Sequence, residues 1–251
     1  MMKPAIQYQS DLFWEDDKPD TRSIISDNFR IIDIYPTDII HHKINPSLAF
    51  RGSLNFAKKI RLNLDFTNCK NWIPVFRNHI LSPHSTFFND LGFFANYSTD
   101  FPCFIRPADG FKTFAGQVFD DRTRFIEEYN YLTDSCNYDN SLLCVCAPCK
   151  TIDKEWRTVF VDNTFIDGCQ YLEQNDLAME NIPDDVVQYA KDISYHPYFI
   201  NIPNFIIDIC LCDGKLHLLE INSFECSSFY NCNLDKIYSS WAKAINSTNF
   251  R

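Results

Sequence analysis

The sequence is poor in glycine, with 6 glycines in 251 residues beside 23 phenylalanines. Glycine averages about 7% of residues in proteins, so this is well under half the usual share. Glycine-rich loops that cradle phosphates should therefore be scarce. Neither G-x-G-x-x-G nor G-x-x-x-x-G-K occurs. Phosphate binding through loops of the P-loop or dinucleotide type is excluded.

The chain also lacks an excess of basic residues and a long apolar run. Lys and Arg number 23 against 33 Asp and Glu, for a net charge of −10. This balance argues against nucleic acid or an anionic membrane as the main partner, although a local basic pocket remains compatible with it. The start, Met1–Ser10, lacks the apolar core of a signal peptide, and no stretch of about 18 apolar residues exists. We therefore expect no membrane partner and a cytoplasmic location, or the host cytoplasm if the protein is viral.

Cysteine is abundant, and the count of eleven is odd. Without a signal peptide, free thiols packed as small apolar groups in a reducing compartment are expected. The spacing of Cys144, Cys146 and Cys149 could supply three thiolates to zinc. The alternative is that Leu142–Cys146 is a buried strand, because no second C-x-x-C or H-x-x-x-H motif completes four ligands.

The hydrophobic pattern changes near residue 100, which predicts a boundary between residues 1–100 and 101–251. The first part has short apolar runs broken by prolines, which favours short strands and loops over long helices. In the second part, Asp162-Asn163 and Asp213-Gly214 predict hairpin turns. The further elements that we expect are a short helix at 54–62, strands at 29–35, 102–107, 142–146, 156–162, 164–168, 204–212 and 215–221, a loop at 108–116, and helices at 121–131, 183–193 and 234–245.

Two carboxylates and an amide stand in the predicted C-terminal hairpin. Asp208 lies in its first strand, and Glu220 and Asn222 lie two apart in its second strand, so the latter two point to one face. Each acid is flanked by apolar residues, an alternation that fits a solvated sheet face. The other interpretation is a site for Mg²⁺, which prefers oxygen ligands and completes its shell with phosphate oxygens and water.

Three cations stand near predicted turns and strand ends and could bind phosphates. Arg106 ends a strand, Lys112 lies in the loop that follows, and Arg157 begins another strand. Arg and Lys side chains suit phosphate recognition, although a single surface cation is usually only solvated.

The segments FIRPADGFKTFAG (104–116), KEWRTVFVDNTFIDGCQY (154–171) and NFIIDICLCDGKLHLLEIN (204–222) resemble an ATP-grasp domain. They most resemble an ATP-grasp clade of bacteria and phages whose signature is two arginines and a lysine, and FRGSLNF (50–56) is similar to the N-terminal region of that clade. The resemblance covers about residues 50–245. It implies an α+β fold in which two α+β lobes sandwich ATP. It also implies that residues 1–100 form a pre-grasp-like α/β region, which could bind substrate, and that residues 101–251 form the catalytic core.

The resemblance also implies roles for nine residues. Arg106 would reach the α- and β-phosphates of ATP, and Lys112 would lie on a loop that closes over the phosphates. Arg157 would touch the γ-phosphate or an acyl phosphate. Cys146 and Ala147 would lie beside the adenine, and Glu155 would also contact the nucleotide. Asp208, Glu220 and Asn222 would hold one or two Mg²⁺ ions, with Mn²⁺ as an alternative.

The activity that the resemblance implies is an ATP- and Mg²⁺-dependent carboxylate–amine ligase. A substrate carboxylate would attack the γ-phosphorus to give an acyl phosphate, and an amine would then displace phosphate to form an amide. The expected partners are ATP, a carboxylate substrate and an amine acceptor of the amino acid, peptide or protein class. The alternatives are a kinase on the same fold and a nucleotide-binding interaction protein without turnover. No Ser, Cys or His nucleophile is required.

Overall fold

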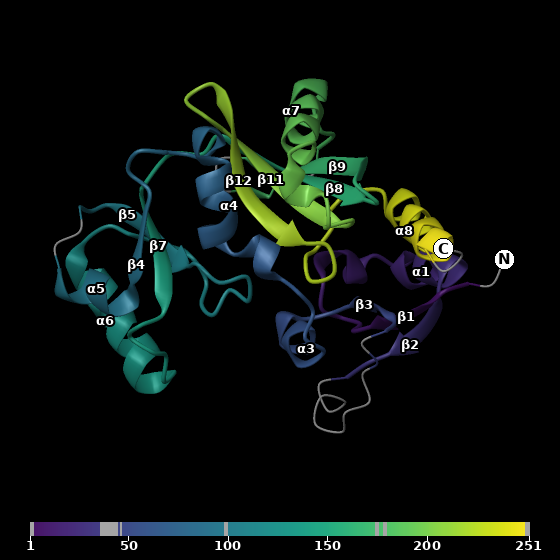
Figure 1. Ribbon diagram of the computed structural model, residues 1–251, viewed down its shortest axis with the longest axis horizontal. Coiled ribbons are helices and arrows are strands. Elements are labelled where there is room, and N and C mark those ends of the chain that lie inside the picture. Colours follow the sequence, from purple (N-terminus) through teal and green to yellow (C-terminus); the bar gives the residue numbers. More distant parts are fainter. Residues whose placement is uncertain are drawn as a thin grey trace. The chain divides into compact units, whose positions relative to one another are not determined.

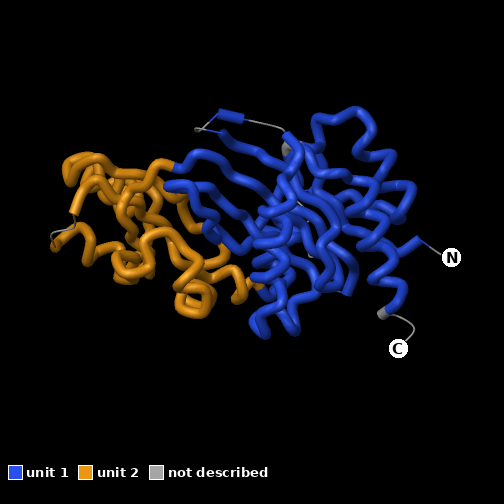
Figure 2. Tube along the Cα trace, turned by 90° about the horizontal axis from the view of Figure 1, so that it is seen from above, with its two compact units in different colours: residues 1–63, 152–251 blue, residues 64–151 orange. Residues whose placement is uncertain are grey.

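The computed structural model describes residues 3–35, 45, 47–97, 100–173, 176–177 and 180–248. The chain forms two compact units (Figure 2). Unit 1 consists of residues 1–63 and 152–251, and unit 2 consists of residues 64–151. The boundary expected near residue 100 lies inside unit 2, so the compact units do not follow it. No described helix is both long and apolar enough to cross a membrane.

Unit 1 contains a small parallel sheet from the N-terminal part of the chain, in the order β2-β1-β3. Its strands are β1 (Ala5–Tyr8), β2 (Arg30–Asp33) and β3 (Ala49–Arg51). Helix α1 (Thr21–Asn28) connects β1 to β2, and α3 (Leu54–Lys59) follows β3. The predicted strand at 29–35 and the predicted short helix at 54–62 are thus confirmed.

The larger sheet of unit 1 is antiparallel, in the order β10-β9-β8-β11-β12. Its strands are β8 (Lys154–Val161), β9 (Thr164–Glu173), β10 (Asp176–Leu177), β11 (Phe205–Cys212) and β12 (Lys215–Ser223). Both predicted hairpin turns are confirmed. Asp162-Asn163 and Asp213-Gly214 each have two positive φ angles, which suit the twist of a two-residue hairpin.

Both faces of this sheet are covered. Val159 and Ile206 share a buried cluster with side chains of α1 and of α8 (Leu234–Thr248), and these two helices lie side by side in Figure 1. The next residues along the two strands, Phe160 and Phe205, point to the opposite face and stack against each other at 4.8 Å between ring centroids. Helix α7 (Asp184–Ser194) contacts β8 and β11. Strands β8 and β11 therefore have two apolar neighbours, and a polar side chain on them needs a partner.

Unit 2 is built on a four-stranded antiparallel sheet in the order β4-β7-β5-β6. Its strands are β4 (Phe87–Asp90), β5 (Cys103–Pro107), β6 (Gln117–Phe119) and β7 (Leu143–Pro148), and its helices are α4 (Cys69–Val75), α5 (Leu91–Asn96) and α6 (Arg122–Asn130). The predicted strands at 102–107 and 142–146 and the predicted helix at 121–131 are confirmed. Helices α1, α4 and α5 have no predicted counterpart, because such short helices depend on tertiary packing more than on their own sequence.

Candidate active site

A row of charged side chains crosses three neighbouring strands of unit 1. Asp208 on β11 lies directly opposite Arg157 on β8 and Glu220 on β12. The next pair along the β11–β12 hairpin is Ile209 with Leu218, so Leu219 is an extra residue and forms a β-bulge. This bulge sets the register that brings Glu220 opposite Asp208.

The three ligands proposed for a metal lie in direct contact. Asn222 Nδ2 donates to Asp208 Oδ2 at 2.8 Å and to Glu220 Oε2 at 2.9 Å, so one amide bridges two carboxylates. Asp208 and Asn222 are each 2% exposed, and Glu220 is half-buried. The interpretation of these strands as a solvated sheet face is therefore wrong for Asp208 and Asn222.

Arg157 holds Asp208 with a two-pronged ion pair. Nε and Nη2 donate to the two carboxylate oxygens at 2.9 and 2.7 Å, and Nη1 donates to the carbonyl of Ser228 at 2.6 Å. Burial by itself would lower the pKa of Arg157, but the Asp208 carboxylate more than offsets this effect and holds the pKa well above its usual value. Arg157 therefore stays charged and acts on the orientation of Asp208.

Two tyrosine rings cover the Arg157 guanidinium. Tyr171 and Tyr230 stack at 4.8 Å between centroids, and Arg157 Cζ lies 4.7 Å from the centroid of Tyr230. Tyr171 is the extra residue of a second β-bulge, between β8 and β9. Neither tyrosine carried a signal in the sequence, because a bulge and a long loop place them here.

Glu155 lies next to this cluster at the start of β8. It accepts a hydrogen bond from the Tyr171 hydroxyl. Burial raises the pKa of Glu155, and the negative charges of Asp208 and Glu220 raise it further. The structure thus brings five of the nine predicted site residues together on unit 1: Glu155, Arg157, Asp208, Glu220 and Asn222.

The other four predicted residues belong to unit 2. Arg106 is a half-buried residue of β5, opposite Val145 on β7. Cys146 and Ala147 lie on β7, opposite Ile105 and Phe104 of β5. Lys112 is exposed in the loop between β5 and β6.

The loop that carries Lys112 is anchored to its own unit. The Asp109 carboxylate accepts hydrogen bonds from Phe111 N and Thr113 Oγ1, each at 2.9 Å. At the end of the loop, Gly116 lies so close to β5 that an added Cβ would be 2.6 Å from the Phe104 ring and 3.0 Å from Arg106 Cβ. A glycine is therefore needed where the loop returns beside Arg106.

The cysteines at 144, 146 and 149 do not converge. Cys144 and Cys146 are buried in the apolar core of unit 2, whereas Cys149 is exposed. Burial raises the pKa of Cys144 to about 12, which disfavours a thiolate ligand. Within the part of the chain that the structure describes, no three His, Cys, Asp or Glu side chains form a group that could hold a metal ion. The buried-strand interpretation therefore describes Cys144 and Cys146.

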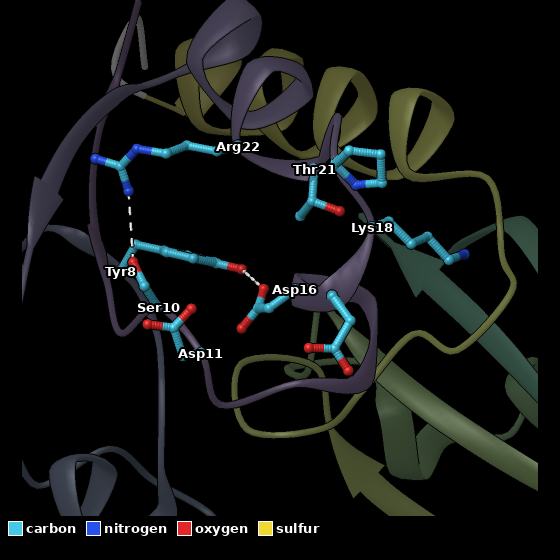
Figure 3. A pocket seen from close by; sticks show the side chains of 9 residues that line it. Tyr8, Ser10, Asp11, Asp16, Lys18, Thr21 and Arg22 are labelled. Carbon is cyan, nitrogen blue, oxygen red and sulfur yellow. Dashed lines mark hydrogen bonds between the residues drawn. The ribbon is translucent and has the colours of Figure 1, made fainter.

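A small polar pocket of about 230 Å³ lies at the end of β1 and the start of α1. Figure 3 shows that Tyr8 donates to Asp16 on one side and that Arg22 donates to Ser10 on the other. Asp11, Asp17 and Lys18 also line it, so both signs of charge are present.

The fold and the polar row across β8, β11 and β12 are those of the ATP-grasp class. Residues 87–240, more than half of the chain, match an ATP-grasp domain family, the second family of the clade named for two arginines and a lysine. The chain belongs to this family, and the expected α+β ATP-grasp fold is confirmed. No curated protein matches the chain at the level of sequence.

Solved structures similar to this chain share its fold at low sequence identity. D-cycloserine synthetase DcsG has a TM-score of 0.60 at 12% identity, over 97% of this chain and 99% of that one. D-alanine–D-alanine ligase from Bacillus anthracis complexed with ATP has a TM-score of 0.58 at 13% identity, over 100% and 98%. L-amino acid ligase from Bacillus licheniformis has a TM-score of 0.53 at 11% identity, over 87% and 67%.

Proposed function

We propose that this protein is an ATP- and Mg²⁺-dependent carboxylate–amine ligase. The observation that carries the proposal is the amide of Asn222, which bridges Asp208 and Glu220 on neighbouring strands while Arg157 holds Asp208. Membership of the ATP-grasp family and the ligases among the similar structures support it.

The donor set fits a hard divalent cation. Asp208, Glu220 and Asn222 supply only oxygen donors, which Mg²⁺ and Mn²⁺ prefer. Asn222 donates through Nδ2 to both carboxylates, and its Oδ1 accepts no hydrogen bond from any residue that the structure describes. That oxygen is thus available to a cation. Asp208 would contribute through lone pairs that its bonds to Arg157 and Asn222 leave unused. One or two bound ions would neutralise phosphate charge during transfer.

The residues of this chain would bind and orient the reactants. Arg106 and Lys112 are proposed to bind the phosphates of ATP. Arg157 would act at the γ-phosphate or acyl phosphate, and mainly through Asp208 as it is paired here. Cys146, Ala147 and Glu155 are proposed to contact the nucleotide.

The proposed reaction has two steps. The substrate carboxylate oxygen attacks the γ-phosphorus, the bond to the bridging oxygen breaks, and ADP leaves with the electron pair. The amine nitrogen then attacks the acyl carbon, phosphate leaves with its oxygen, and the nitrogen loses a proton to give the amide. Such phosphoryl transfer requires positioning and charge neutralisation more than a protein nucleophile.

The proposed acceptor is an amino acid, a peptide or a protein terminus, by analogy with the amino acid ligases of the same fold. Residues 1–100 are proposed as a pre-grasp-like region that contributes to substrate binding, and residues 101–251 as the catalytic core. None of the eleven cysteines forms a disulfide, which fits a reducing compartment, and we propose the cytoplasm, or the host cytoplasm if the protein is viral.

The reaction can be tested without knowing the acceptor. The protein is incubated with ATP, Mg²⁺ and pools of amino acids, with hydroxylamine as a small nucleophile. An acyl phosphate gives a hydroxamate together with ADP and phosphate, and mass spectrometry identifies the carboxylate. Glu220→Gln should abolish this product, whereas Glu173→Gln, a matched change at the edge of the same sheet, should retain it. ADP with a stable phosphorylated product would instead identify a kinase. ATP binding without turnover on any pool would contradict the ligase.

A further inference from the structure

A fully buried ion pair joins two N-terminal segments of unit 1. Arg51, the last residue of β3, donates through Nη2 to Glu15 Oε1 at 2.5 Å, and both side chains are 0% exposed. The Arg51 guanidinium lies between the rings of Phe13 and Phe229, with Cζ 4.0 and 3.7 Å from their centroids. Buried charges cost free energy unless further hydrogen bonds satisfy them. The position of those further bonds therefore indicates what the pair holds.

The further bonds of the pair go to one segment, residues 223–230, which we call the post-Asn222 loop. Arg51 Nη1 donates to the carbonyl of Phe224 at 2.6 Å. Glu15 Oε2 accepts from Ser228 Oγ at 2.5 Å and from Phe229 N at 3.0 Å. The ion pair thus holds both ends of the loop that directly follows Asn222.

Ser228 connects this pair to the candidate active site. Its hydroxyl donates to Glu15, and its carbonyl accepts from Arg157 Nη1 at 2.6 Å. Arg157 in turn binds both oxygens of Asp208. A continuous chain of hydrogen bonds therefore runs from Glu15 through Ser228 and Arg157 to Asp208. All members belong to unit 1.

We propose that Glu15 and Arg51 are positioning residues that fix Arg157, and through it Asp208, by holding Ser228. The role in catalysis rests on the proposed function, but the positioning itself is a property of the protein alone. Without the Ser228 hydroxyl, the carbonyl of Ser228 would lose its fixed orientation, and Nη1 of Arg157 would lose a fixed acceptor. The guanidinium would then rotate more freely beside the tyrosine rings.

The matched variants are neighbours in the loop. Ser228→Ala removes the hydroxyl but keeps the Arg51–Glu15 pair and the Ser228 carbonyl. Ser228→Thr restores a hydroxyl. Ser227→Ala removes a hydroxyl one residue earlier, outside the chain of bonds. Glu15→Gln tests the pair itself, because its single carbonyl oxygen cannot serve both Arg51 and the loop.

The first readout is nitrogen-15 NMR of the Arg157 side chain, with the signal assigned by its loss in Arg157→Lys. In the wild type, Ser227→Ala and Ser228→Thr we expect slow rotation, seen as separate Nη signals. In Ser228→Ala and Glu15→Gln we expect averaged signals. Unchanged Arg157 signals in Ser228→Ala would overturn the proposal.

The second readout is the calorimetric Kd of ATP with Mg²⁺, measured beside the melting temperature. Loss of one hydrogen bond should weaken binding by roughly three- to tenfold in Ser228→Ala, and the change should exceed anything its stability explains. A lowered melting temperature with unchanged Kd would show a purely structural role and overturn the proposal. If the wild type binds no ATP, the proposed function fails, and the NMR readout still decides the positioning.

Discussion

Arg157 grips Asp208 across two neighbouring strands, with Nε and Nη2 bound to the two carboxylate oxygens at 2.9 and 2.7 Å. Their side chains are only 7% and 3% exposed, so each charge depends on the other. The pair therefore has two separable functions, in stability and in the orientation of Asp208 beside Asn222.

Replacement of Arg157 alone should be more harmful to stability than replacement of both partners. Arg157→Met leaves Asp208 buried and unpaired, so we expect a loss of about 3–5 kcal/mol in the free energy of unfolding. Arg157→Met with Asp208→Leu should recover most of this loss yet bind no ATP with Mg²⁺. Urea denaturation and calorimetry measure the two effects. Additive losses in the double variant would contradict mutual dependence.

Glu220 is expected to matter for binding more than for folding. It is half-buried, and Glu220→Gln keeps its shape, so the free energy of unfolding should change little. The Kd of ATP with Mg²⁺ or Mn²⁺ should rise roughly tenfold or more, because a charged oxygen ligand is lost. Glu173→Gln on β9 is the control, since Glu173 pairs with Lys154 on the surface. Equal affinities in the two variants would argue against a metal at Glu220.

The phosphate-binding role of unit 2 can be tested through Gly116 as well as through the cations. Arg106→Ala and Lys112→Ala should each weaken ATP binding roughly tenfold. Gly116→Ala should also weaken it, because the new Cβ would meet Phe104 and Arg106 Cβ at 2.6 and 3.0 Å. Arg124→Ala, at an exposed residue of α6 in the same unit, should bind ATP normally. Calorimetric titration distinguishes these cases, and normal binding by Arg106→Ala would exclude its proposed role.

Glu155 should make stability depend on pH. Burial raises its pKa above the ordinary value of 4.5, so the native protein holds a proton there that the unfolded chain has lost. Between 4.5 and the raised pKa, the free energy of unfolding should therefore fall as pH rises. Glu155→Gln, which can still accept a hydrogen bond from Tyr171, should be less sensitive to pH in this window. Urea denaturation at several pH values measures the difference, and parallel curves for the two proteins would contradict the prediction.

Much of the local structure follows from short-range sequence signals. The hairpins at Asp162-Asn163 and Asp213-Gly214 were predictable, because those residue pairs accept the positive φ angles that a two-residue turn requires. The helices at 122–130, 184–194 and 234–248 follow from charge and apolar spacing. The short helices α1, α4 and α5 were not predictable, since they rely on contacts made after folding.

The candidate site divides in the same way. The sequence determined that Asp208, Glu220 and Asn222 meet, because a tight hairpin between their strands leaves few registers. It did not determine that Arg157 pairs with Asp208, which requires β8 to lie beside β11. Nor did it reveal Tyr171 or Leu219 as bulge residues.

The low glycine count and the acidic charge excluded a glycine-rich phosphate loop and a general affinity for polyanions. Those exclusions needed only composition. The link between Glu15 and Ser228 spans 213 residues, and no local pattern encodes it. Only the tertiary structure decided that contact, because burial of Glu15 and Arg51 leaves the post-Asn222 loop as the partner for their remaining hydrogen bonds.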